Sequence, residues 1–303
     1  MSLSELSVRE LQKLHFDEEC IFCEKVLGLP RFSSERKEVL NKGYEFAITV
    51  KEEIGKKKGV ELISHGATKH TIKLLKKLVK EKLSESNDPI ALYEAGVGYG
   101  YAIENILSRF RKEYESGLLT IKGCDIFLQP RMSSLMEVNP LLDITKDDIF
   151  DSLSKLPNNS IDVFYADNVI EHFLPDEAET ILSEIAKKMK QGAYFYVFIP
   201  NKYIGPGDVS RYFLPLGSKA LGTHFMEMSF NEITKLMGKY SFHHTYCVGY
   251  IPKTSLIFCI KKQALIKIKL KMEPILRKIP TRFLRRVVFA LSGYSVSVMR
   301  KTT

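Results

Sequence analysis

The string Glu94-Ala-Gly96-Val-Gly98-Tyr-Gly100 has the residue types and spacing best suited to holding a ligand. It follows a short apolar run typical of a strand and precedes a segment with helical spacing. Glycines at such a turn let the backbone approach a ligand closely, and a helix that starts there offers free N–H groups. The string therefore predicts a crevice for a nucleotide-like cofactor at the carboxyl ends of parallel strands.

The spacing of the glycines excludes two common phosphate-binding motifs. A dinucleotide fingerprint requires G-x-G-x-x-G, but the third position is Tyr101 when counted from Gly96 and Ile103 when counted from Gly98. The sequence also contains no G-x-x-x-x-G-K-[ST] string, which excludes a P-loop.

The pattern acid-x-G-x-G-x-G resembles that of the class I S-adenosylmethionine (SAM)-dependent methyltransferases. The resemblance implies that Glu94 ends the first strand and that the glycine loop runs under the amino-acid portion of SAM. It also implies that Asp125, at the end of the second strand, binds both ribose hydroxyls. A carboxylate suits that position because it can accept two hydrogen bonds from a vicinal diol.

Further landmarks of the same family follow in the expected order between residues 89 and 262. Ile161-Asp-Val-Phe-Tyr-Ala-Asp-Asn-Val-Ile-Glu-His172 resembles its fourth-strand signature, and Gly192 to Asn201 resembles its fifth strand. By the same resemblance, Asp167 and Asn168 would lie beneath the sulfonium end of SAM. A weak third strand is expected at 134–142, and the resemblance then places the pair Asp143 and Ile144 at the adenine.

Two histidines are the candidates for catalysis. Methyl transfer from SAM is a direct displacement, so positioning supplies much of the catalysis, and a hydroxyl acceptor also benefits from a general base. His172 follows the fourth strand, where the Glu-His pair of related enzymes often serves only to order the loop beside the cofactor. His224 lies in a glycine- and proline-containing insertion after the fifth strand, where relatives often build the acceptor pocket.

No metal site is expected. Cys20-Ile-Phe-Cys23 has the spacing of half a zinc site, but the remaining cysteines are isolated and supply no second half.

The alternation of strands and helices predicts an α/β fold with a doubly wound, mostly parallel, seven-stranded sheet. The expected division is an N-terminal helical cap at 1–88, a SAM-binding methyltransferase domain at 89–262 and a basic, amphipathic C-terminal extension at 263–303. Five cysteines and the absence of a secretory signal or a long apolar run favour a cytoplasmic protein.

The charge of the chain is concentrated at its C-terminal end. The net charge is +9, but residues 261–303 hold 7 Lys and 5 Arg against one Glu, which is 12 − 1 = +11 and leaves −2 for residues 1–260. A basic amphipathic helix would suit peripheral contact with an anionic membrane. Docking onto the N-terminal helices, or dimerisation, would account for the same pattern, and the oligomeric state stays open.

Three functions compete at this stage. The first is SAM-dependent methyl transfer, most simply to oxygen, on a small-molecule or glycan-type acceptor, which could be lipid-linked. The second is a natural-product or quinone-type methyltransferase. The third is a non-catalytic interaction protein that keeps the fold. A nucleic-acid substrate is not expected, because the Asn/Asp-Pro-Pro-Tyr/Phe string of base-amino methyltransferases is replaced by Ala166-Asp-Asn-Val.

Overall fold

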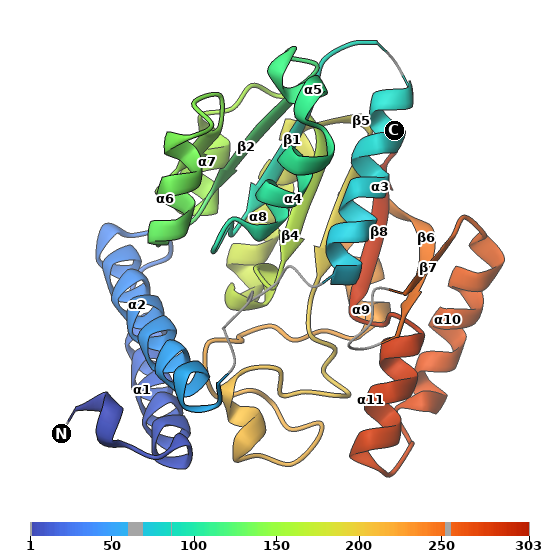
Figure 1. Ribbon diagram of the computed structural model, residues 1–303. Helices are drawn as coiled ribbons and strands as arrows, with labels where there is room; N and C mark the ends of the chain where they lie inside the picture. Colours follow the sequence, from blue (N-terminus) through green and yellow to red (C-terminus); the bar gives the residue numbers. More distant parts are fainter. Residues whose placement is uncertain (1, 60–68, 86, 252–255, 303) are drawn as a thin grey trace.

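An eight-stranded β-sheet with helices on both faces forms the centre of the computed structural model, which describes residues 2–59, 69–85, 87–251 and 256–302 (Figure 1). The strand order is β3-β2-β1-β4-β5-β8-β6-β7. The strands from β3 to β5 in this order are parallel, whereas β8 is antiparallel to both β5 and β6, and β7 is antiparallel to β6. Their bounds are β1 Ile90–Ala95, β2 Leu119–Cys124, β3 Asp143–Thr145, β4 Ile161–Asp167, β5 Met189–Phe198, β6 Phe242–Tyr250, β7 Ile257–Ile260 and β8 Val296–Lys301.

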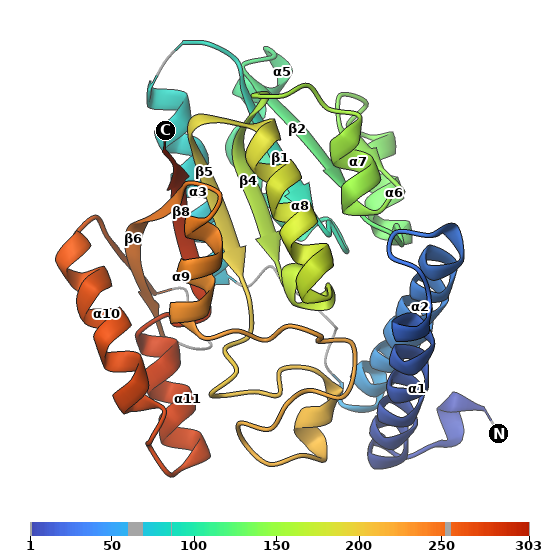
Figure 2. The ribbon, with the colours of Figure 1, turned by 180° about the vertical axis from the view of Figure 1, so that it is seen from behind.

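Successive side chains of each strand point to opposite faces of the sheet and form two apolar layers, one on each face. One layer packs against α3 Lys69–Glu85, α4 Tyr101–Arg109, α5 Arg111–Glu115 and α6 Pro130–Glu137. The other packs against α7 Ile149–Ser154, α8 Pro175–Lys188 and α9 Phe230–Gly238, which Figure 2 shows from behind. The predicted α/β class with a mostly parallel sheet is confirmed.

Two details of the predicted architecture are wrong. The sheet has eight strands rather than seven, because the last strand of the chain, β8, inserts between β5 and β6. The expected strand at 134–142 is instead helix α6, which begins at Pro130, followed by a short β3. Proline is favoured in the first turn of a helix because its missing N–H has no intrahelical partner there.

The N-terminal region is helical, as the sequence predicts. It contains η1 Leu3–Glu5 and the paired helices α1 Val8–Gly28 and α2 Ser34–Lys57. Helix α3 lies within the predicted cap, but its buried leucines pack against the sheet. The sheet core therefore begins at α3.

The C-terminal region contains α10 Gln263–Leu276 and α11 Arg282–Leu291, followed by β8. The two helices contact each other and β6, at the side of the molecule opposite α1 and α2 (Figures 1 and 2). The expected extension at 263–303 thus supplies a strand to the sheet. Among the described residues, no helix is long and apolar enough to cross a membrane.

Candidate active site

The glycine loop turns sharply between β1 and α4. Gly96, Gly98 and Gly100 all have positive φ angles, of 68°, 51° and 74°, which side chains rarely adopt. A Cβ on Gly96 would lie 2.7 Å from Val169 Cγ2, and one on Gly100 would lie 2.6 Å from Met132 Sδ. Glycine is therefore required at these two positions by conformation and by space.

Three acidic side chains meet beside this loop. Glu94 lies near the end of β1, Asp125 directly follows β2, and Asp167 ends β4. Neighbouring parallel strands bring their carboxyl ends to one edge of the sheet, so these acids converge although they span 74 positions of sequence.

The acids differ in how their oxygen atoms are satisfied. Asp125 accepts hydrogen bonds from the backbone N–H of Gly98, at 2.8 Å, and of Phe127, at 3.0 Å. Asp167 accepts one from the hydroxyl of Tyr165 at 2.9 Å and one from the side-chain amide of Asn168 at 2.7 Å. Glu94 is only 4% exposed, and its Oε2 has no hydrogen-bond partner among the described residues.

Burial and mutual repulsion make this cluster unfavourable as three bare anions. Burial raises the pKa of Glu94 well above its usual value, and the charges of Asp167 and Asp125 raise it further. Burial likewise raises the pKa of Asp125, against the backbone hydrogen bonds that it accepts, and raises the pKa of Asp167. A cationic ligand that donates hydrogen bonds would relieve both the repulsion and the unpartnered oxygen.

The remaining residues predicted to contact the cofactor lie in different surroundings. Asn168 has a positive φ of 56° and donates to Asp167 within the cluster. Asp143, at the start of β3, is exposed and forms an ion pair with Lys122 at 2.7 Å. Ile144 is buried in the apolar layer. Contact of Asp143 and Ile144 with an adenine stays a prediction.

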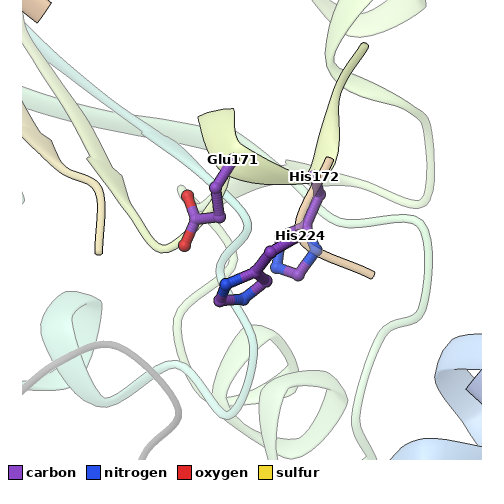
Figure 3. Close-up of side chains that lie close together, drawn as sticks. All are labelled: Glu171, His172 and His224. Atoms are coloured by element: carbon purple, nitrogen blue, oxygen red, sulfur yellow. The ribbon is translucent and has the colours of Figure 1, made fainter. Parts of the chain in front are cut away.

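A second cluster contains both candidate catalytic histidines. Figure 3 shows the side chains of Glu171, His172 and His224 close together. Glu171 and His172 belong to a short helical turn, η2 Ile170–His172, directly after β4, whereas His224 comes from segment 201–229 between β5 and α9. The imidazole centroids of His172 and His224 are 4.9 Å apart.

Hydrogen bonds determine which ring nitrogen of each histidine carries the proton. Nδ1 of His172 lies 3.0 Å from the backbone oxygen of Thr223, which can only accept, so this nitrogen carries the proton. Nδ1 of His224 donates in the same way to Oε1 of Glu227, at 2.8 Å. In the neutral form of each ring, Nε2 therefore keeps its lone pair.

The two histidines differ in their affinity for a proton. Burial lowers the pKa of His172 to about 3, with a further contribution from His224. Burial alone would also lower the pKa of His224, but the hydrogen bond to Glu227 and the charges of Glu171 and Asp208 outweigh it and raise that pKa. His224 is therefore the better proton acceptor of the two.

Glu171 is the unsatisfied member of this cluster. Its side chain is fully buried, and neither carboxylate oxygen has a hydrogen-bond partner among the described residues. Burial raises the pKa of Glu171 to about 7, against an opposing effect of His224. Its two oxygens could accept hydrogen bonds from a ligand.

The same three side chains offer the ligand atoms that a divalent ion would use. One atom from each lies within 4.8 Å of the other two, and the Nδ1 hydrogen bonds hold both imidazoles as metal-binding histidines are often held. The expectation of no metal from the sequence stays a prediction.

Other segments complete the surroundings of this cluster, and sequence reasoning missed them. The ring of Tyr44, on α2, packs edge-on against His172 with a centroid distance of 5.4 Å. Glu19, on α1, accepts a hydrogen bond from the backbone of Thr223 at 3.3 Å. Glu227 follows His224 by three residues in an irregular segment, where spacing carries no signal. The role of α1 and α2 as a cap over an acceptor stays a prediction.

Comparisons with known proteins agree with this geometry. Residues 93–197 match the family model of a methyltransferase domain. No curated protein matches the chain. A 1,6-didemethyltoxoflavin-N1-methyltransferase from Burkholderia thailandensis, solved with its substrate and S-adenosylhomocysteine, is similar in structure, with a TM-score of 0.52 and 12% identity, and the match covers 91% of this chain and 93% of that one.

A second solved structure is the CurJ carbon methyltransferase, with a TM-score of 0.50 and 14% identity over 77% of this chain and 54% of that one. At these identities the structural likeness shows the fold alone. The family match covers the glycine loop, the three acids and the Glu171–His172 pair. Residues 93–197 therefore form a methyltransferase domain, within a fold that this chain shares with SAM-dependent methyltransferases.

Proposed function

We propose that the protein methylates a hydroxyl oxygen of a small-molecule or glycan-type acceptor, with His224 as the general base. The observation that carries this proposal is the buried His224–Glu227 hydrogen bond beside the unsatisfied carboxylate of Glu171. A histidine held by a carboxylate, with its other nitrogen free, is the arrangement that removes a proton from a hydroxyl.

The acid cluster and the glycine loop would hold SAM. Glu94 and Asp167 suit its ammonium and sulfonium groups, and Asp125 suits its ribose hydroxyls, because carboxylates attract cations and accept hydrogen bonds from ammonium and hydroxyl groups. Bound SAM would supply a methyl carbon on a positively charged sulfur, which is a good leaving group for direct displacement.

His224, its partner Glu227 and His172 have separate roles in this proposal. Nε2 of His224 accepts the proton of the acceptor hydroxyl as the new carbon–oxygen bond forms. Glu227 holds the imidazole in the required tautomer and stabilises the imidazolium that results. Nε2 of His172 accepts a hydrogen bond that orients the acceptor, since its low pKa makes it a poor base.

The experiment incubates the protein with SAM carrying an isotopically labelled methyl group and with a panel of sugars, glycolipids and phenols. Product NMR distinguishes an O-methyl from an N- or C-methyl group by chemical shift. We expect O-methyl product, a loss of about 10²- to 10⁴-fold in kcat for His224→Asn, and unchanged SAM affinity.

His243→Asn is the matched control, because His243 is an exposed histidine on β6. A His224→Asn variant that keeps its rate, or labelled product methylated only on nitrogen or carbon, would contradict the proposal. Those outcomes would favour an acceptor that needs no base.

A further inference from the structure

The two C-terminal helices present apolar side chains outward on the side away from the sheet. On α10 the exposed large apolar residues are Ile268, Met272 and Ile275, spaced by four and three positions. The buried residues of the same helix are Ile266, Lys269 and Glu273, and none of them lies in this stripe. The outward stripe therefore does not contribute to the core.

Helix α11 repeats this arrangement. Phe283, Leu284 and Leu291 are exposed, with Phe283 80% exposed, whereas Phe289 is buried against Tyr294. At 100° per residue, the exposed group lies roughly opposite Phe289.

Strand β7, next to these helices, also exposes apolar residues. Phe258 lies directly opposite Gly249 of β6, so their side-chain positions are on the same face of the sheet. A Cβ built on Gly249 would touch the backbone of Leu291, at the end of α11, and the ring of Phe258. The ring of Phe258 therefore lies on the face that α11 covers. Phe258 and Ile260 are 54% and 45% exposed, and they point the same way because they are two residues apart.

The exposed charges that the C-terminal segment itself carries have a single sign. The exposed basic residues of the described part of 261–303 are Lys261, Lys262, Lys267, Lys271, Arg277, Lys278 and Arg286. The sole acidic residue of that segment, Glu273, is buried and accepts hydrogen bonds from Asn201, Phe230 and Asn231.

Hydrogen bonds hold the helices in this orientation. Nζ of Lys269 donates to the backbone oxygen of Gly293 at 2.6 Å. The hydroxyl of Tyr294 donates to the backbone oxygen of Lys269 at 2.8 Å. Arg285 of α11 donates to the backbone oxygen of Tyr203 at 3.1 Å, which ties the helix to segment 201–229. Docking onto the N-terminal helices does not occupy this surface, because α1 and α2 lie at the opposite side of the molecule (Figures 1 and 2).

We infer that α10, α11 and β7 form a docking surface for an anionic lipid bilayer, with the apolar stripes inserted among the acyl chains and the lysines against the headgroups. Charge complementarity selects this occupant, since helices whose described side chains expose apolar residues together with basic charges alone match the chemistry of an anionic interface. Arg285 links the surface to segment 201–229, which also carries His224. The inference does not depend on the acceptor or on methyl transfer.

The test is co-sedimentation of the full chain with phosphatidylcholine vesicles that contain phosphatidylglycerol, compared with pure phosphatidylcholine vesicles. We expect binding to the anionic vesicles only, and weaker binding at high salt. The double substitution Lys267→Ala and Lys271→Ala should weaken it by about 30-fold, at about 1 kcal/mol for each lysine near the surface.

Phe283→Asp should also weaken vesicle binding, and Val138→Asp is its matched control, because Val138 is 74% exposed outside these helices. SAM affinity, measured for every variant, reports folding independently of the membrane. Binding that is absent, or unchanged by Phe283→Asp, would overturn the inference. A dimer in sedimentation velocity that Phe283→Asp dissociates would instead assign the surface to a second copy of the chain.

Discussion

Substitution of Glu94 by glutamine should weaken SAM binding and stabilise the protein at the same time. Glu94 is buried, its Oε2 has no partner among the described residues, and burial together with Asp167 and Asp125 raises its pKa. The ionised carboxylate is therefore costly to the free protein and useful only when a cationic ligand is present. Glutamine keeps the shape of the side chain and removes its charge.

The size of both effects follows from this environment. A hydrogen bond to a charged group contributes about 1.5–3 kcal/mol, so SAM should bind about 10- to 140-fold more weakly to Glu94→Gln. Removing a buried charge that lacks compensation should raise the free energy of unfolding by about 1–3 kcal/mol. For a chain of this length, each kcal/mol corresponds to about 1.6 °C in Tm.

The stability effect should depend on pH in a defined direction. Because the pKa of Glu94 is higher in the folded than in the unfolded state, the folded state binds the proton more tightly and loses stability as the pH rises. The advantage of glutamine should therefore be present at neutral pH and disappear below about pH 4, where the carboxyl is protonated in both states.

Calorimetric titration with SAM and thermal unfolding at the two pH values measure these effects. Glu137→Gln is the control, because Glu137 is exposed on α6 and should alter neither quantity. The reasoning would be refuted by a Glu94→Gln protein that binds SAM as tightly as the original, or that unfolds at a lower temperature at neutral pH.

Three further predictions concern the two clusters. Asp125→Asn should lower SAM affinity by about tenfold or more in the same titration, because the carboxylate is expected to bind the ribose hydroxyls; unchanged affinity would remove that role. The rate of methyl transfer should rise with pH through the raised pKa of His224, because its imidazolium cannot accept a proton. A pH profile of His224→Asn should lack this rise, and its persistence would assign the titration to another group. Dialysis against EDTA should leave the rate unchanged, since no metal is expected; activity lost on chelation and restored by zinc would show that Glu171, His172 and His224 bind an ion.

Local sequence was sufficient to predict the elements that have a clear apolar run or a glycine turn. The apolar runs at β1, β2, β4 and β5 predict strands at the correct positions, and the glycine loop between β1 and α4 has the backbone conformation that its composition requires. The expected strand at 134–142 was wrong because Pro130 starts a helix there, and burial of Met132 against the glycine loop stabilises it. The strand propensity of that segment was too weak to outweigh tertiary packing.

The second cluster could be predicted only in part. His172 and His224 were identified from their positions relative to the strands, but the hydrogen bond of Glu227 and the ring contact of Tyr44 depend on contacts between irregular or distant segments. No periodicity relates residues of a loop to those of a remote helix, so the sequence contains no signal for such contacts.

The sequence by itself determined the α/β class, the glycine loop, the acids that follow the strands and the basic character of the C-terminal region. These properties depend on composition and short spacing, which local chemistry converts directly into structure. The tertiary structure decided that β8 completes the sheet, that His224 rather than His172 is the stronger base, and that α10 and α11 face outward. Each of these depends on which surfaces become buried against one another, and burial is a property of the whole fold.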